Sequence, residues 1–203
     1  MKIICIGRNY AEHAKEMNSP VPTEPVVFLK PDTALLRDNA PFYYPDFTSD
    51  LHHEVELVLK ISKAGKHIQP EFAGRYYDEI GIGIDFTARD VQMQCKAKGL
   101  PWEKAKAFDH SAPIGRFVPK TSLGNLNAIG FHLDVNGQTV QRGNTSDLLF
   151  NFDVLVAHVS QYFTLKTGDL IFTGTPEGVG PVKRGDVLTA YIGNEEMLNF
   201  EIR

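Results

Sequence analysis

The stretch Leu51-His52-His53-Glu54-Val55-Glu56-Leu57-Val58-Leu59-Lys60-Ile61-Ser62 decides how this chain folds. His53 and four aliphatic side chains occupy every second position up to residue 61, which is the period of a strand with one buried face. Glu54 and Glu56 share the opposite face. We therefore predict a strand over residues 51–62 that turns an apolar face to the core and presents two carboxylates on the other face.

A second stretch, residues 79–86, has the same period. Three isoleucines and a phenylalanine alternate with Gly81, Gly83 and Asp85. Because glycine carries no side chain, we expect open space beside the Asp85 carboxylate. A strand whose polar face carries glycines and one aspartate suggests a pocket on that face.

The remaining patterns predict further strands. They are expected at residues 2–6, 26–29, 129–135, 138–142, 170–173, 187–192 and 197–202. Asn136-Gly137 is typical of a hairpin turn between two of them. Residues 31–50 show no clear period and are expected to be irregular.

Three modest helices are also predicted. The first is expected over residues 10–17, with Asn9 as its cap. The second begins at a capping box at residues 87–90 and ends at Gly99. The third is expected over residues 152–163. Strands do not alternate regularly with helices along the chain. The predicted fold class is therefore α+β and mostly β, with a curled or closed mixed sheet.

The composition argues against several classes of protein. The chain has 203 residues, with 21 lysines and arginines against 25 aspartates and glutamates, for a net charge of −4. This charge argues against nucleic acid as a partner, and no apolar run approaches the roughly 20 residues that span a membrane. Cys5 and Cys95 are too few for a disulfide framework or a cysteine zinc site. We expect one domain over residues 1–203 and a reducing, cytoplasmic location.

Glu54, Glu56 and Asp85 are candidate metal ligands. Two glutamates at i and i+2 of a strand lie roughly 7 Å apart, and burial worsens the repulsion between them. Hard carboxylate oxygens suit Mg²⁺ or Mn²⁺. The alternative is a solvated face on which the glutamates pair with lysines, and the residues alone leave both interpretations open.

His13 and Glu16 are candidates for proton transfer. On a helix over residues 10–17, their i, i+3 spacing puts both on one face. There a carboxylate can orient an imidazole as a general base. An ordinary surface pair is the alternative. His52 and His53 could serve as extra metal ligands, although His53 is expected to pack with the apolar positions.

Two further segments could bind an anion. Lys104 and Lys106 follow Pro101-Trp102 in a segment expected to be a loop, where a lysine could neutralise a carboxylate or an enolate. Solvent-exposed lysines are the alternative. Residues 173–180 (TGTPEGVG) offer backbone N–H groups in a tight loop. They match no phosphate-binding or dinucleotide-binding motif, and a plain connecting loop is the alternative.

Taken together and in order, the motifs resemble the fumarylacetoacetate hydrolase superfamily. The matching stretches are residues 7–16 (GRNYAEHAKE), 28–31 (FLKP), 52–57 (HHEVEL), 85–92 (DFTARDVQ), 98–102 (KGLPW) with Ala105-Lys106, and 168–180 (GDLIFTGTPEGVG). They extend over nearly the whole chain. The chain is similar to the small, single-domain branch of the superfamily that contains acylpyruvases and oxaloacetate decarboxylases.

The resemblance implies a mixed β-roll, a homodimer, and Mg²⁺ or Mn²⁺ held by Glu54, Glu56 and Asp85. It also implies catalytic roles for His13 and Glu16, on a lid within residues 1–20, and for Lys106. The residues that it assigns to substrate binding are Arg8, Arg89, Gln92, Gly174 and Thr175.

The activity implied is cleavage of a C–C bond in a short 2-oxo acid. In this hypothesis His13 activates a water that attacks an acylpyruvate, and the metal and Lys106 hold the departing pyruvate enolate. The products are pyruvate and a carboxylate. The alternatives on the same site are decarboxylation or tautomerisation of oxaloacetate, and isomerisation or decarboxylation of a 2-hydroxyhepta-2,4-diene-1,7-dioate-type acid. A non-catalytic oxo-acid-binding module and a structural β-domain are rivals from other classes.

Overall fold

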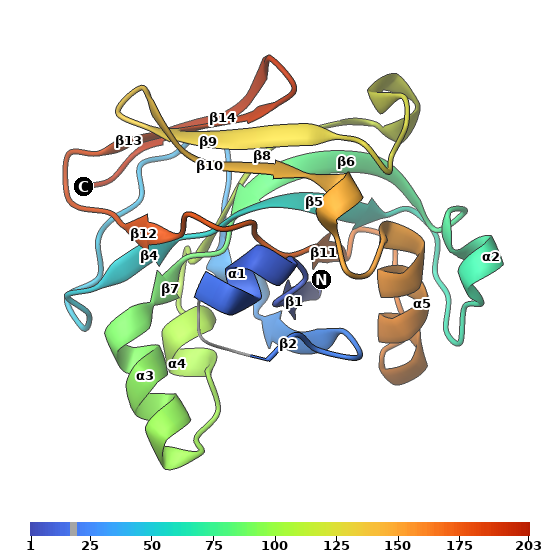
Figure 1. Ribbon diagram of the computed structural model, residues 1–203, viewed down its shortest axis with the longest axis horizontal. Coiled ribbons are helices and arrows are strands. Elements are labelled where there is room, and N and C mark those ends of the chain that lie inside the picture. The colour runs from blue at the N-terminus through green and yellow to red at the C-terminus, as the bar shows by residue number, and fades with distance from the viewer. Residues whose placement is uncertain (17–19) are drawn as a thin grey trace.

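The computed structural model describes residues 1–16 and 20–203. Figure 1 shows a mostly β molecule with one helix near its middle and the others toward its two ends. The largest sheet has seven strands in the order β2-β1-β11-β5-β6-β8-β3. The pairs β1–β11 and β3–β8 are parallel and the others antiparallel, so the sheet is mixed as predicted. Its strands are β1 (Ile3–Gly7), β2 (Val26–Lys30), β3 (Leu35–Leu36), β5 (Val55–Ile61), β6 (Tyr77–Ile84), β8 (Ala112–Pro119) and β11 (Leu170–Phe172).

Two smaller sheets complete the β structure. Four antiparallel strands, yellow to red in Figure 1, form a layer in the order β10-β9-β13-β14. They are β9 (Gly130–Val135), β10 (Gln138–Asn144), β13 (Val187–Ile192) and β14 (Glu195–Glu201). The third sheet has the order β12-β4-β7, with β4 (Leu51–His53), β7 (Thr87–Ala88) and β12 (Gly180–Pro181). The predicted turn at Asn136-Gly137 joins β9 to β10, and both turn residues have positive φ.

The described residues contain five α-helices rather than the three predicted. They are α1 (Ala11–Glu16), α2 (Pro70–Ala73), α3 (Arg89–Lys98), α4 (Glu103–Lys106) and α5 (Phe152–Tyr162), with short 3-10 helices at Asp32–Ala34, Lys120–Leu123 and Thr145–Asp147. Because α2 and α4 are single turns, no periodic pattern could reveal them. Met17, at the predicted end of the first helix, lies outside the described residues. Within the described part of the chain, no helix has the length and apolar character needed to cross a membrane.

Helix start signals are wrong, whereas the stop signal at Gly99 is confirmed. Gly99 has φ of 62° and ends α3 in the left-handed conformation. Thr87 makes no cap, because its hydroxyl donates to Glu54 Oε1 at 2.9 Å. Asn9 directs its amide to backbone groups elsewhere in the fold. Side chains that resemble local caps in the sequence make long-range contacts instead.

Strands β3 and β8 lie in segments for which no strand is predicted. In β8, Pro113, Gly115 and Pro119 interrupt the alternation by which a strand is recognised. Residues 31–50 are otherwise irregular, as expected, apart from a single 3-10 turn and the two residues of β3 in the described structure.

The predicted strand over residues 51–62 is interrupted at Glu54. The residues before it form β4 in the third sheet, and the residues after it form β5 in the large sheet. Strands β6 and β7 flank Asp85 and belong to the same two sheets. The Asp85 N–H donates to the Glu54 carbonyl at 2.8 Å. The chain therefore changes sheets twice, at two hydrogen-bonded residues that both carry a carboxylate.

The core lies on both faces of the large sheet. On one face, Leu57, Leu59 and Ile80 belong to a cluster shared with the four-stranded sheet and α5. On the other face, Val58 belongs to a second apolar cluster. Strand β5 is thus buried on both sides, and Glu56 is only 2% exposed. This burial rules out a solvated face for the glutamates.

Asp85 lines a pocket as expected, but the expectation that Gly81 and Gly83 open this space is wrong. Gly81 and Gly83 lie against aromatic rings on the second face of the sheet. A Cβ added at Gly83 would lie 2.8 Å from the Phe172 ring and 3.0 Å from the Pro113 carbonyl oxygen. These glycines make room for packed rings, and the pocket forms where the chain changes sheets.

We predict that Gly83→Ala destabilises the fold. The added methyl meets a backbone oxygen and a buried ring, and such overpacking costs about 1–3 kcal/mol. Thermal unfolding should show a melting temperature lower by several degrees, at about 2–4 °C per kcal/mol for a chain of this size. Gly130→Ala is the control, because its Cβ would meet only Asn144 Nδ2 at 4.0 Å. Equal melting temperatures for Gly83→Ala and the wild type would contradict this packing.

Candidate active site

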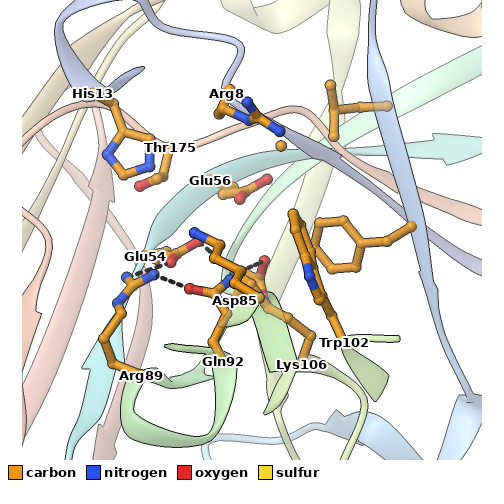
Figure 2. Close-up of a pocket in the computed structure, with 14 residues that line it drawn as sticks. Arg8, His13, Glu54, Glu56, Asp85, Arg89, Gln92, Trp102, Lys106 and Thr175 are labelled. Atoms are coloured by element: carbon orange, nitrogen blue, oxygen red, sulfur yellow. Dashed lines mark hydrogen bonds and ion pairs between the residues drawn. The ribbon is translucent and has the colours of Figure 1, made fainter. Parts of the chain in front are cut away.

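Glu54, Glu56 and Asp85 converge in the interior, close to the two sheet changes (Figure 2). One carboxylate oxygen of each residue lies within 4.8 Å of those of the other two. All three residues are buried, with at most 5% of their surface exposed. Three hard oxygen ligands at this spacing are a donor set that Mg²⁺ or Mn²⁺ accepts.

Three buried cations surround these carboxylates. Lys106 donates to Glu54 and to Asp85, at 2.7 Å each, and Lys30 lies 2.8 Å from the other Asp85 oxygen. Arg89 donates to Glu54 at 2.8 Å. Burial would raise the pKa of Glu54, but Lys106 and Arg89 hold it well below its ordinary range. Charges of both signs must be buried together, because an unpaired ion in the interior is strongly destabilising.

Glu56 is the carboxylate without a cation of its own among the ion pairs of the described residues. Its Oε2 accepts the Gly174 N–H at 2.7 Å. Burial raises the pKa of Glu56 well above its ordinary range, and the negative charges of Asp85 and Glu54 raise it further. A divalent cation among the three carboxylates would relieve this repulsion. The residues present therefore fit a metal ion.

His13 and Glu16 lie together on α1, as the spacing predicts. His13 Nδ1 is 3.2 Å from Glu16 Oε2, and Glu16 Oε1 accepts the Gly178 N–H at 3.1 Å. His13 is 5% exposed and lines the same pocket as the carboxylates. Because Nδ1 faces Glu16, Nε2 is the nitrogen left to exchange a proton with a ligand.

Asn9 ties the N-terminal segment of the site to the glycine-rich loop. Its Nδ2 donates to the carbonyls of Phe150 and Thr173, and its Oδ1 accepts the Phe150 N–H. Gly174 has φ of 104°, and a Cβ there would lie 2.7 Å from the Asn9 Cβ. Only glycine fits this position, which is also the one whose N–H reaches the carboxylate cluster.

The structure brings the predicted site residues together. Figure 2 shows Arg8, His13 and Thr175 on one side of the carboxylates, and Arg89 with Gln92 on the other. Those that line the pocket are Arg8, His13, Glu54, Glu56, Asp85, Arg89, Gln92, Lys106 and Thr175. Glu16 and Gly174 reach it through their hydrogen bonds to His13 and Glu56.

One expectation and one alternative for individual residues fail. Lys106 lies on the single-turn helix α4 rather than in a loop, whereas Lys104 on the same turn is exposed. The alternative that His52 and His53 are extra ligands also fails. His52 contacts Asp50 at 2.9 Å, and the His53 ring is hydrogen-bonded to a glutamine of β10.

Sequence reasoning missed several residues that support the site. In the sequence, Lys30 is noted only within the motif at residues 28–31. In the structure it is buried against Asp85 and donates to Ser111 Oγ at 2.9 Å. A lysine that ends an apolar strand is the signal that could have found it. Gln141 of β10 is 1% exposed and contacts both His53 and the glycine-rich loop, and nothing in its own strand marks it.

Comparison with known families agrees with this fold. The family model described as fumarylacetoacetate (FAA) hydrolase C-terminal matches residues 2–201. The match extends over every site residue described above. This chain therefore belongs to the fumarylacetoacetate hydrolase family and is an enzyme of that family.

Individual relatives match along nearly their whole length. Oxaloacetate tautomerase FAHD1, mitochondrial, of Mus musculus is 45% identical over 201 residues, which cover 99% of this chain and 91% of that protein. Oxaloacetate decarboxylase, mitochondrial, of Dictyostelium discoideum is 43% identical over 203 residues, covering 99% and 93%. The crystal structure of fumarylpyruvate hydrolase from Pseudomonas aeruginosa in complex with Mn²⁺ and pyruvate aligns with a TM-score of 0.94 and 38% identity, covering 100% of this chain and 89% of that chain.

We predict that Glu56→Gln stabilises the metal-free protein increasingly as the pH rises. The raised pKa means that the folded wild type holds the Glu56 proton more tightly than the unfolded chain does. Its stability therefore falls as the pH rises above the ordinary glutamate pKa of about 4.3, and glutamine has no such loss. Urea unfolding of both proteins in EDTA, between about pH 5 and pH 8, measures the difference.

The matched control is Glu79→Gln, which changes a half-exposed carboxylate paired with Lys60 on the neighbouring strand. We expect its stability relative to the wild type to change far less with pH. A Glu56→Gln advantage that stays constant over this pH range would show that ionising Glu56 costs no more in the folded protein than in the unfolded chain.

Proposed function

We propose that this chain is a divalent-metal-dependent oxaloacetate tautomerase, with Mg²⁺ or Mn²⁺ held by Glu54, Glu56 and Asp85. We thus favour oxaloacetate as the substrate, whereas the hypothesis drawn from the sequence favours an acylpyruvate. It is supported by the relatives named for oxaloacetate, which match 99% of this chain at 45% and 43% identity. A related structure with Mn²⁺ and pyruvate supports the choice of metal and of ligand class.

The observation that carries the proposal is the charge of the pocket. Three buried carboxylates and three buried cations cancel, so a divalent ion adds an excess of two positive charges. Arg8 and Lys96 line the same pocket. Burial and the positive charges of Arg89 and Arg8 lower the pKa of Lys96, a sign of positive charge concentrated there. Oxaloacetate carries two carboxylates and suits this excess better than an acylpyruvate, which carries one.

His13 is suited to move the proton that tautomerisation requires. The enol forms when one proton leaves C3 of oxaloacetate and one arrives at the C2 oxygen. His13 Nε2 can take the C3 proton, because Glu16 contacts Nδ1 and holds the ring with Nε2 free. Lys106 is bonded to two carboxylates and acts as a positive charge near the enolate oxygen rather than as a base. The bound metal supplies Lewis acidity toward the keto group.

A second candidate is hydrolysis of an acylpyruvate, the first hypothesis from the sequence. The His13–Glu16 pair favours it, because the same base could activate a water. The fumarylpyruvate hydrolase that matches at 38% identity also favours it. Decarboxylation of oxaloacetate needs only the loss of CO₂ to give pyruvate enolate, so it requires no base and could accompany either activity.

Other expectations stay predictions. They are the homodimer, the single catalytic domain over residues 1–203, and the lid within residues 1–20. A cytoplasmic location also stays a prediction for this chain, since the names of the mouse and Dictyostelium relatives place those two proteins in mitochondria.

We predict metal-dependent turnover of oxaloacetate. Decay of the ultraviolet absorbance of enol-oxaloacetate should accelerate with the protein and Mg²⁺, and EDTA should return it to the buffer rate, because the metal stabilises the enolate charge. Release of pyruvate from oxaloacetate and from acetylpyruvate is followed in parallel samples. Metal-dependent cleavage of acetylpyruvate without any effect on the oxaloacetate enol would overturn the proposal in favour of the hydrolase.

We predict that His13→Gln separates proton transfer from decarboxylation. Tautomerisation should fall by about 100-fold or more, the usual contribution of a general base, whereas pyruvate release from oxaloacetate should fall much less. Glu12→Gln, an exposed change on the same helix, is the control and should affect neither rate. Equal losses of both rates in His13→Gln would argue that His13 does not act as the base.

A further inference from the structure

Gln141 lies behind the site and uses its whole side-chain amide in four hydrogen bonds. Its Oε1 accepts from the Val55 N–H at 3.0 Å and from His53 Nδ1 at 2.9 Å. Its Nε2 donates to Thr175 Oγ1 at 2.9 Å and to the Pro176 carbonyl at 3.0 Å. Gln141 is 1% exposed, so water does not compete for these groups. One side chain of β10 thus joins the strand after Glu54 to the glycine-rich loop.

Two backbone groups fix which way the Gln141 amide faces. The Val55 N–H can only donate, so the atom that faces it must be the oxygen. The Pro176 carbonyl can only accept, so the atom that faces it must be the nitrogen. A flipped amide would put two donors together at one end and two acceptors together at the other. The orientation therefore follows from the chemistry of the partners.

This orientation determines the role of the Thr175 hydroxyl. Gln141 Nε2 is a donor, so Thr175 Oγ1 accepts in this bond and its own proton must point elsewhere. Among the described residues, no acceptor takes that proton in a hydrogen bond. Thr175 and His13 both line the pocket, and Figure 2 shows them on the same side of the carboxylates. Its hydroxyl is therefore left to donate into the pocket.

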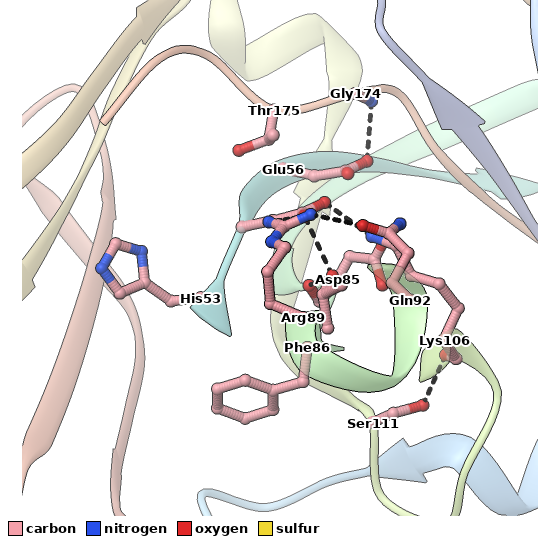
Figure 3. A network of polar contacts seen from close by, with 12 residues as sticks. His53, Glu56, Asp85, Phe86, Arg89, Gln92, Lys106, Ser111, Gly174 and Thr175 are labelled. Carbon is pink, nitrogen blue, oxygen red and sulfur yellow. Dashed lines mark hydrogen bonds and ion pairs between the residues drawn. The ribbon is translucent and has the colours of Figure 1, made fainter. Parts of the chain in front are cut away.

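His53, on the side of Gln141 away from the site, donates in the same direction as Gln141 does. Because its Nδ1 faces the Gln141 oxygen, that nitrogen must carry a proton. Figure 3 shows His53 and Thr175 on separate segments, with Glu56 next to the loop that carries Thr175. The donors thus run in one direction, from His53 to Gln141 and from Gln141 to Thr175, which leaves the Thr175 proton for a further acceptor.

We propose that Gln141 is a positioning residue that makes the Thr175 hydroxyl a hydrogen-bond donor to the carboxylate of a 2-oxo acid. The class of ligand rests on the proposed function, whereas the direction of the relay rests on the hydrogen bonds alone. Gln141 touches neither the ligand nor the metal ligands. Its substitution should therefore weaken binding of the acid and leave binding of the metal unchanged.

The experiment measures binding of pyruvate by calorimetry in saturating Mn²⁺, with Gln141→Glu as the first variant. The introduced carboxylate still accepts from Val55 and His53 but draws the Thr175 proton toward itself. We expect the dissociation constant of pyruvate to rise about tenfold, as for loss of a hydrogen bond to a charged group. The affinity for Mn²⁺ alone should stay within about twofold of the wild type. Gln138→Glu makes the same change at an exposed position of β10 and should alter neither constant.

A double-mutant cycle with Thr175→Val separates positioning from a general structural effect. Thr175→Val should weaken pyruvate binding about as much as Gln141→Glu, and Thr175→Ser should keep the wild-type affinity. In the Thr175→Val background, Gln141→Glu should bring no further loss, because the hydroxyl that it misdirects is gone. Gln141→Met, of similar length and uncharged, removes the donor to Thr175 Oγ1 without adding a charge, and it is measured in both backgrounds alongside Gln141→Glu.

Three results would overturn the relay. One is pyruvate affinity within about twofold of wild type in folded Gln141→Glu and Gln141→Met. Another is a double variant in which the dissociation constant of pyruvate rises by the product of the increases in the Gln141 and Thr175 single variants. The last is a wild type that binds Mn²⁺ but not pyruvate. Because the readout is binding, a protein that binds pyruvate through this relay without turning over oxaloacetate would refute the proposed function alone.

Discussion

Placing three carboxylates within 4.8 Å of one another in a protein interior is the constraint around which this molecule is built. Each buried charge carries a desolvation penalty of several kcal/mol, which is comparable with the whole stability of a domain, about 5–15 kcal/mol. Lys30, Arg89 and Lys106 offset this penalty, and they come from the end of β2, the start of α3 and the end of α4. The packing of these three elements around the site is therefore tied to the charges that they bring.

Backbone N–H groups bind carboxylates that the three buried cations do not contact. The chain changes sheets at Glu54 and at Asp85, so both side chains leave regular strands where the two sheets meet. The glycine-rich loop then uses its N–H groups on the protein's own carboxylates, with Gly174 donating to Glu56 and Gly178 to Glu16. Within the trio, Glu56 alone makes no ion pair among the described residues. This lack of a contacting cation suits the cluster to a metal ion and, through the metal, to an anionic oxo acid.

Much of this arrangement is predictable from the sequence, because alternation and short motifs are local signals. The strands of the large sheet around Leu57 and Ile82, the hairpin at Asn136 and the stop of α3 all follow from local patterns. The acidic trio and the dyad also follow, although their convergence needed the family resemblance. What the sequence conceals is contact across the fold. Thr87 looks like a cap but bonds to Glu54, and Gln141 gives no local sign that it contacts His53 and Thr175.

The most direct test of the central claim is a calorimetric titration of Mn²⁺ into metal-free wild type and into Glu56→Gln. Glu56 has no described ion pair, so the substitution leaves Lys30, Arg89 and Lys106 with their partners. We predict one Mn²⁺ bound per wild-type chain, and affinity at least about tenfold weaker in Glu56→Gln, as expected on replacing a charged ligand with a neutral one. Equal affinity in the two proteins, or no binding to the wild type, would contradict a metal site at the acidic trio.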